Sequence, residues 1–153
     1  MNQVVVKQEK SGYQIVEAYK SLRTNLQFCG EDKKVIAVTS CTPNEGKSSV
    51  SMQLGISLAE SGKRVILIDA DLRKSVLLGR TKTQKSVRGL AHFLSGQATL
   101  EDVICSTNVK NFYMIYSGPF PPNPAELLGG KNFRSLLNAL RKVYDLSLIH
   151  ISE

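Results

Sequence analysis

Residues 40–49 read SCTPNEGKSS and separate two apolar segments of different periodicity. The preceding segment, VIAVT at 35–39, is rich in β-formers and predicts a strand. After the stretch, Val50, Leu54 and Leu58 recur at helical spacing. A helix start leaves backbone N–H groups unpaired, with the positive end of the helix dipole behind them. This strand–loop–helix junction is therefore suited to hold a phosphate group.

The residue types in the loop favour a nucleotide phosphate bound with Mg²⁺. Gly46 lets the backbone approach an anion closely, Lys47 supplies positive charge for the β- and γ-phosphates, and Ser48 offers a hydroxyl to Mg²⁺. The pattern G-x-x-x-x-G-K-[ST] is met except at Cys41, so the loop turns by other means, at 43–44. The residues expected to contact the nucleotide are Pro43, Asn44, Glu45, Gly46, Lys47, Ser48 and Ser49.

A second motif follows the next predicted strand. The run VILI at 65–68 is typical of a buried strand in a parallel sheet, and it leads into Asp69 and Asp71. Ligands of open parallel sheets bind beyond the carboxyl ends of strands, and residues two apart on extended backbone point to the same side. One aspartate can then organise Mg²⁺ while the other accepts a proton from an incoming hydroxyl. The competing interpretation is that one of them merely caps the following turn.

Composition narrows the class of protein. A chain of 153 residues with 42% hydrophobic residues suits one soluble globular domain, and no stretch approaches the roughly 20 apolar residues of a membrane span. The polar start lacks the apolar core of a signal peptide, so we expect a cytoplasmic protein. Three cysteines without metal-ligand spacing favour reduced thiols. A net charge of +7 suits an anionic membrane surface or an acidic partner, and no nucleic-acid motif is present.

The remaining patterns predict an α/β domain with a mainly parallel sheet between helices. We expect helices over 13–28, 89–96, 99–104 and 131–142, a third strand at 112–116, and a helix that begins at Asn123–Pro124. Residues 1–12 read as a polar lead-in with a short valine run, and residues 74–88 as a basic loop. His92 has no apparent catalytic partner and is expected on a helix surface or in packing.

Five segments together resemble the bacterial tyrosine kinases (BY-kinases) of capsule and exopolysaccharide synthesis, relatives of the MinD/ParA ATPases. These segments are EAYKSLRTNLQF (17–28), SCTPNEGKSS, VILIDADLRK (65–74), GLAHFLSG (89–96) and SGPFPPNPAELLGG (117–130). The last is the most discriminating, because the nucleotide motifs are shared across the superfamily. The resemblance spans about residues 13–145. It implies a P-loop NTPase-like three-layer sandwich that uses ATP and Mg²⁺ to phosphorylate protein tyrosines, its own included.

The resemblance implies roles for individual residues. Lys47 and Ser48 would be the Walker A lysine and Mg²⁺ ligand, and Asp69 and Asp71 the Walker A′ pair. Asp69 would be the base for the tyrosine hydroxyl, and Asp71 would act at the Mg²⁺ site. Thr42 stands where MinD/ParA proteins carry a signature lysine, which favours a kinase over a partitioning ATPase.

Assembly and partners follow from the same resemblance. The helix at 13–28 is expected to oligomerise through Glu17, Lys20 and Arg23, at the family's E-x-x-R-x-x-R motif. Lys20 lacks the planar bidentate pairing of arginine, which would weaken ring assembly. The implied partners are a membrane-embedded polysaccharide co-polymerase that activates the kinase, further copies in a ring, and protein tyrosine substrates, with no nucleic acid. The protein would then lie in the cytoplasm, held by its partner at the inner face of the plasma membrane.

The resemblance stops near Leu146. The family would continue as an apolar strand ending in D-T-P-P, whereas residues 146–153 read LSLIHISE, with His150 at the position of the Walker B aspartate. We hypothesise that the sequence is cut short and that residues from about Leu146 are not native coding sequence. The chain would then be the N-terminal part of a single kinase domain, with weak nucleotide binding and little or no kinase activity. A MinD/ParA-type ATPase switch and a non-catalytic nucleotide-binding assembly module stay open as other functions.

Overall fold

The structure, a computed structural model, describes residues 1–6, 13–30, 32, 34–39, 47–72, 81–83, 88–119 and 121–151, with the backbone alone at 13–16, 47–49 and 81–83. Its strands are β1 (Asn2–Val6), β2 (Val35–Val38), β3 (Val65–Asp69), β4 (Thr81–Thr83), β5 (Cys105–Thr107), β6 (Phe112–Ile115) and β7 (Leu146–His150). Its helices are α1 (Tyr13–Phe28), α2 (Lys47–Glu60), α3 (Leu90–Leu94), α4 (Leu100–Val103), α5 (Pro124–Gly129) and α6 (Lys131–Val143).

The described strands form one mixed sheet in the order β2-β7-β3-β6-β5-β1-β4. The four strands β2, β7, β3 and β6 run parallel to one another. Beyond them, β5 is antiparallel to β6, β1 is parallel to β5, and β4 is antiparallel to β1. The prediction of a mainly parallel sheet is confirmed, and its carboxyl ends meet at one edge, as ligand-binding α/β sheets require.

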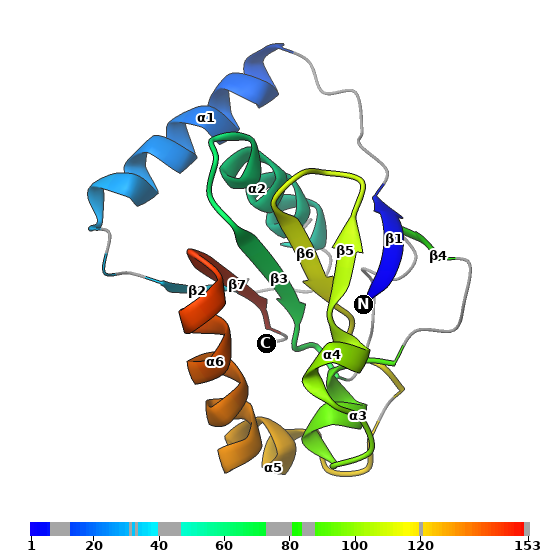
Figure 1. Cartoon of the computed structure of the whole chain (residues 1–153). Helices are drawn as coiled ribbons and strands as arrows, with labels where there is room; N and C mark the ends of the chain where they lie inside the picture. Colours follow the sequence, from blue (N-terminus) through cyan, green and yellow to red (C-terminus); the bar gives the residue numbers. More distant parts are fainter. Residues whose placement is uncertain are drawn as a thin grey trace.

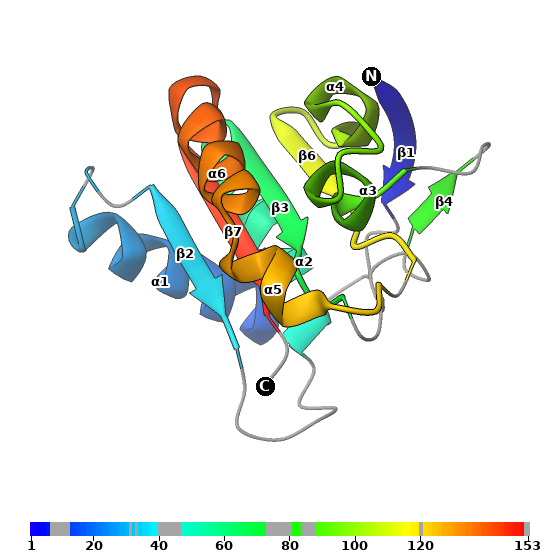
Figure 2. The ribbon, with the colours of Figure 1, turned by 90° about the horizontal axis from the view of Figure 1, so that it is seen from below.

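Helices cover both faces of the sheet, which gives the predicted three layers (Figures 1 and 2). On one face, Leu54 and Leu58 of α2 pack in a cluster with Leu67 of β3. On the other face, α3 and α6 pack in a second cluster that includes Ile66 and Ile68 of the same strand. Alternate side chains of β3 thus enter opposite layers, and every residue of this strand is buried, as its continuous apolar run predicts. Helix α1 packs on α2 at the rim of its layer.

Three short strands depart from the sequence-based interpretation. Residues 2–6 form β1 in place of a lead-in, and residues 81–83 of the predicted basic loop form β4, its antiparallel neighbour. Both pairings join segments far apart in the chain, so no local turn signal announces them. The strand β5 was also missed, because its three residues directly follow a helix and carry no periodicity of their own. The other residues of the predicted 74–88 loop, apart from Arg88, lie outside the described part of the chain.

Most predicted elements are confirmed with shifted ends. The predicted helices at 89–96, 99–104 and 131–142 correspond to α3, α4 and α6, and the third strand corresponds to β6. Thr99 and Asp102 form the expected capping box, since the Thr99 hydroxyl accepts the Asp102 N–H and the Asp102 carboxylate accepts the Thr99 N–H. Pro124 occupies the first position of α5, as predicted.

Candidate nucleotide site

The candidate site lies at the carboxyl edge of the three strands β2, β7 and β3. His150 is the register partner of both Val38 and Asp69, so the last residues of these strands stand in one row. The helix α2 ends at Glu60, shortly before β3 begins, and therefore runs antiparallel to the strands. Its 14 residues extend over about 21 Å, longer than the five-residue strand beside it. This length brings the start of α2, at Lys47, back to the same edge.

The two aspartates face the layer that contains α2. Val65 and Leu67 point into the α2 cluster, so strand alternation directs Asp69 to that face as well. Asp69 is fully buried and Asp71 is 8% exposed. The backbone N–H of Asp71 donates to Asp69 Oδ1 at 3.1 Å. Asp69 therefore makes the turn-capping contact considered from the sequence, and this contact fixes the backbone of Asp71 beside the end of β3.

His150 shares this buried position. Its Nδ1 lies 3.3 Å from Asp69 Oδ1, and its side chain is 2% exposed. Leu148 of the same strand points into the α2 cluster, so His150 is also directed to the face that carries Asp69. Among the described residues, no group lies within hydrogen-bonding distance of His150 Nε2. His150 Nε2, which has no partner among the described residues, thus lies at the position where the sequence analysis expected an aspartate.

The donor set at this edge fits Mg²⁺ held jointly with nucleotide phosphates. Mg²⁺ prefers oxygen ligands and is usually bound through one or two carboxylates plus substrate phosphates and water. Asp69 and Asp71 supply two buried carboxylates next to a helix start. No cluster of three or more His, Cys, Asp or Glu side chains that could hold a metal ion occurs in the described part of the chain.

The phosphate-loop residues are only partly within the described structure. Pro43, Asn44, Glu45 and Gly46 lie outside the described residues. The backbone of residues 47–49 forms the first turn of α2, as the predicted strand–loop–helix junction requires. The structure therefore supplies the helix start, and the roles of the loop side chains stay predictions.

The other residues singled out from the sequence lie away from this edge. On α1, Lys20 Nζ pairs with Glu17 Oε1 at 3.5 Å on an exposed surface, whereas Arg23 turns toward α2. His92 Nδ1 accepts the N–H of Gly89 at 3.0 Å at the start of α3, which confirms a packing role. Cys105 is buried, and burial raises the pKa of its thiol to about 11.

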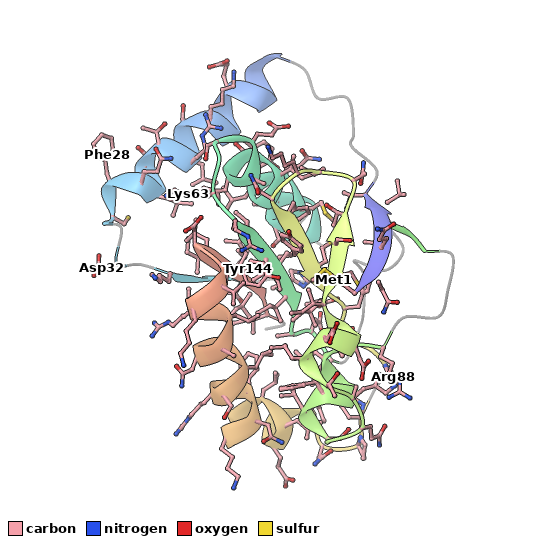
Figure 3. All side chains as sticks on the ribbon, in the orientation of Figure 1. Met1, Phe28, Asp32, Lys63, Arg88 and Tyr144 are labelled. Carbon is pink, nitrogen blue, oxygen red and sulfur yellow. The ribbon has the colours of Figure 1, made fainter. Side chains whose placement is uncertain are left out.

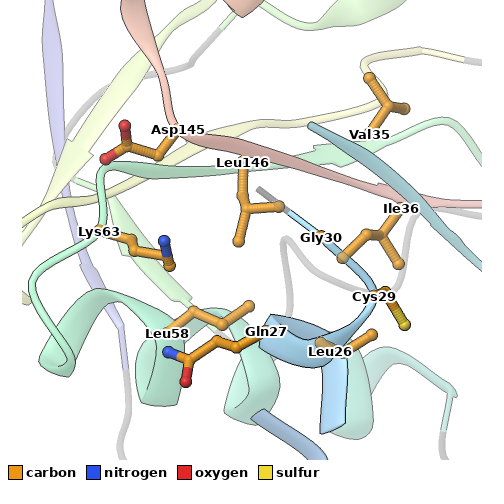
Figure 4. Close-up of a pocket in the computed structure, with 10 residues that line it drawn as sticks. All are labelled: Leu26, Gln27, Cys29, Gly30, Val35, Ile36, Leu58, Lys63, Asp145 and Leu146. Atoms are coloured by element: carbon orange, nitrogen blue, oxygen red, sulfur yellow. The ribbon is translucent and has the colours of Figure 1, made fainter. Parts of the chain in front are cut away.

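A pocket of about 560 Å³ opens at the opposite edge of the sheet (Figure 4). Its lining combines the end of α1, the beginnings of β2 and β7, and single residues of neighbouring elements: Leu26, Gln27, Cys29, Gly30, Val35, Ile36, Leu58, Lys63, Asp145 and Leu146. Val35 and Leu146 are the first residues of their strands, whereas Asp69 is the last residue of β3. The pocket is therefore separate from the candidate nucleotide site.

The chain is similar to proteins of known description. The chain is 44% identical over 133 residues to tyrosine-protein kinase CpsD of Streptococcus pneumoniae serotype 4, a match that covers 87% of this chain and 59% of that protein. The kinase domain of the Escherichia coli tyrosine kinase ETK superimposes with a TM-score of 0.83 and 36% identity, over 90% of this chain and 54% of that chain. The chain thus spans little more than half the length of these relatives.

A more distant neighbour carries a bound nucleotide. The septum site-determining protein MinD of Pyrococcus horikoshii, solved in complex with Mg-ADP, matches with a TM-score of 0.62 and 28% identity over 76% of this chain and 48% of that chain. None of the helices in the described part of the chain has the length and hydrophobicity that crossing a membrane requires. Since the AAA domain family AAA_31 matches residues 33–152, most of the sequence, the chain belongs to that family and has the P-loop fold shared by bacterial tyrosine-kinase domains and MinD.

Proposed function

We propose that this chain carries the ATP-binding part of a protein-tyrosine kinase that phosphorylates tyrosines, including those of neighbouring copies, in the control of capsule or exopolysaccharide synthesis. The observation that carries the proposal is the buried pair Asp69 and Asp71, held at the carboxyl edge of the sheet beside the start of α2. The similarity to CpsD and to the ETK kinase domain supports phosphoryl transfer as the reaction.

In this proposal the chain's residues position the reactants and stabilise charge. The first-turn amides of α2 and Lys47 bind the β- and γ-phosphates, while Ser48 and Asp71 hold Mg²⁺. The bound metal neutralises charge on the phosphates. Asp69 accepts the proton of the tyrosine hydroxyl as its oxygen bonds to the γ-phosphorus and the bond from that phosphorus to the ADP oxygen breaks.

The first test measures nucleotide capture. We expect the chain to bind a fluorescent ATP analogue weakly in the presence of Mg²⁺, and Lys47→Met to lower the affinity at least about ten-fold because the phosphates lose a charge-assisted contact. Lys63→Met is the matched control, since Lys63 lines the pocket at the opposite edge. Equal affinities of the chain and the Lys47→Met variant would refute the proposed site.

Kinase chemistry needs a separate measurement, on a protein of the length of the relatives. We expect anti-phosphotyrosine signal to appear with Mg·ATP, and Asp69→Asn to remove that signal while nucleotide binding persists. Phosphotyrosine formation that survives Asp69→Asn would rule out this residue as the base. We expect robust signal to be lacking from the 153-residue chain alone.

Two other functions predict different outcomes. The likeness to MinD with Mg-ADP favours an ATPase switch, which would release phosphate from ATP without labelling tyrosine. A non-catalytic assembly module would bind nucleotide only for structure, so Lys47→Met would leave complementation of a deletion strain intact. An ATPase assay beside the phosphotyrosine blot separates the first of these from the kinase, and the complementation experiment separates the second.

Assembly at a membrane completes the proposal. Helix α1 presents the pair Glu17–Lys20 and the 84% exposed ring of Phe28, which points away from the body of the molecule (Figure 3). An exposed aromatic ring and an exposed charged pair on one helix suit a contact with another protein surface. We propose that Glu17, Lys20 and Arg23 contribute to a ring of copies, and that a membrane-embedded co-polymerase holds this ring at the inner face of the plasma membrane. Gel filtration of a relative-length protein, with and without Glu17→Ala, tests the assembly step.

We also propose that residues from about Leu146 are not native coding sequence. The support is His150, whose orphaned Nε2 is buried where the resemblance expects the Walker B carboxylate. Sequencing the intact gene should show an aspartate codon at position 150. A histidine codon there would contradict this proposal.

A further inference from the structure

Arg23 joins α1 to the last turn of α2. Its Nη1 donates to the backbone carbonyl oxygen of Ser57 at 3.0 Å and lies 3.4 Å from the Ser57 hydroxyl oxygen. Ser57 is buried and Arg23 is half-buried, so the contact is largely shielded from water. A charge-assisted hydrogen bond in such a place is stronger than the same contact on an open surface.

Helix geometry turns Arg23 inward and leaves its motif partners outside. Tyr19, Arg23 and Leu26 are the half-buried residues of one face, at spacings of four and three. Glu17, Lys20 and Arg23 are each three residues apart, and in a helix of 3.6 residues per turn every such step rotates the side chain back by about 60°. The first two of these residues therefore pair on the exposed surface, while the third reaches the inner flank.

Arg23 brings a positive charge to the negative end of the α2 dipole. The Ser57 carbonyl oxygen already accepts the N–H of Ser61 at 3.2 Å, so Arg23 adds a second, charged donor to it. Helix α2 has no basic residue in its last turn and ends with the acidic Glu60. Arg23 supplies the missing positive charge from another helix. At its other end, α2 begins with Lys47, so one helix carries the Arg23 contact and the candidate phosphate contact at opposite ends.

We propose that Arg23 is a positioning residue that couples α1 to nucleotide occupancy, with α2 as the rigid connection between the two. A phosphate bound at the first turn of α2 orders this helix, and the ordered last turn then holds Arg23, and with it α1, more firmly. Coupling is reciprocal, so a second copy that fixes α1 raises the affinity for nucleotide through the same contact. The inference rests on the proposed nucleotide function, and it gives Arg23 a role inside its own subunit.

Hydrogen exchange of the full chain, with and without Mg·ATP, tests the coupling. We expect Mg·ATP to slow exchange in peptides from the beginning of α2 and also, about three-fold, in peptides from residues 17–28. In Arg23→Gln, protection of α2 should persist while the additional protection of α1 disappears. Arg23→Lys should restore part of it, because the positive charge remains at the end of α2. Arg141→Gln, which removes an exposed arginine from α6, is the matched control and should behave as the unmodified chain.

The outcomes separate the coupling from the proposed function and from simple packing. If Mg·ATP fails to protect α2 in the unmodified chain, the nucleotide function fails and the inference falls with it. If α2 is protected but α1 is not, or if α1 is protected equally in Arg23→Gln, the coupling is refuted and the nucleotide function stands. If Arg23 served packing alone, Arg23→Gln would raise the hydrogen exchange of α1 equally with and without Mg·ATP. That result would also refute the coupling.

Discussion

Helix α2 approaches the sheet so closely that Gly55 has no room for a methyl group. A Cβ added at this position would lie 2.5 Å from Phe112 Cε1 and 3.1 Å from Phe112 Cζ. Ordinary carbon contacts are about 3.5–4.0 Å, so Gly55→Ala forces α2 and β6 apart by about 1 Å. Alanine favours a helix interior by about 1 kcal/mol over glycine, whereas overpacking a core costs about 1–3 kcal/mol. We therefore expect a net loss of up to about 2 kcal/mol in the free energy of unfolding.

Urea unfolding followed by far-UV circular dichroism measures this loss. Gly129→Ala is the control, because its Cβ would meet no atom within 4 Å in α5. This variant gains the helix preference without the clash, so it should be as stable as the unmodified chain or more stable, by up to about 1 kcal/mol. In a double-mutant cycle, Phe112→Leu should remove most of the penalty of Gly55→Ala, because the leucine lacks the ring atoms at the contact. Equal stability of Gly55→Ala and Gly129→Ala would refute the close approach of α2.

Three further changes test other contacts. Burial raises the pKa of Cys105 to about 11, above its ordinary value of 9.0. The contribution of this thiol to the free energy of unfolding is therefore complete below pH 9 and is lost between pH 9 and 11, by up to about 3 kcal/mol, as unfolding in urea measures. Cys105→Ala should abolish that part of the decline. The Arg64 guanidinium lies 5.3 Å from the centroid of the Tyr144 ring. Arg64→Ala should therefore lower the free energy of unfolding by about 0.5–2 kcal/mol in the same assay, and Arg64→Lys should lower it less. Equal effects of the two variants would contradict a planar contact. His150→Asp adds a third carboxylate at the edge that holds Asp69 and Asp71. This variant should melt several degrees lower in EDTA, because like charges repel, and regain stability with Mg·ATP. A melting temperature that does not change with Mg²⁺ would contradict a metal site at this edge.

Local patterns predicted the elements that create the nucleotide edge. The apolar run at 65–68 and the helical spacing after Ser49 each fix an element within a few neighbouring residues, so β3 and α2 followed from sequence alone. The 3.6-residue repeat of α6 was equally informative. Its expected buried face was Phe133, Leu136, Leu137 and Leu140; Leu136 and Leu140 are buried, and Phe133 and Leu137 are partly buried. Because parallel strands end at one edge, the placement of Asp69 beside the start of α2 followed from these elements.

Non-local pairing explains what the sequence did not reveal. In β1, only Val4 and Val6 alternate into the core, which is too short a pattern to distinguish from a polar lead-in. Its partners β5 and β4 lie about a hundred and about eighty residues away, so the pairing depends on the folded sheet. The contact of Arg23 with α2 was missed for a different reason. The motif was treated as three equivalent positions, although residues three apart on a helix point in directions about 60° apart.

The strand β7, residues 146–150, meets different requirements for folding and for the candidate Mg²⁺ site. Backbone hydrogen bonds hold β7 between β2 and β3, and they make no demand on side-chain identity. Leu146, Leu148 and Ile149 supply apolar groups to the two layers, and the small polar Ser147 is buried as well. The residue type matters for the site at position 150, where the side chain lies next to Asp69. An imidazole there is compatible with the fold and has no partner for its buried Nε2 among the described residues, whereas a carboxylate would complete an oxygen-rich site for Mg²⁺.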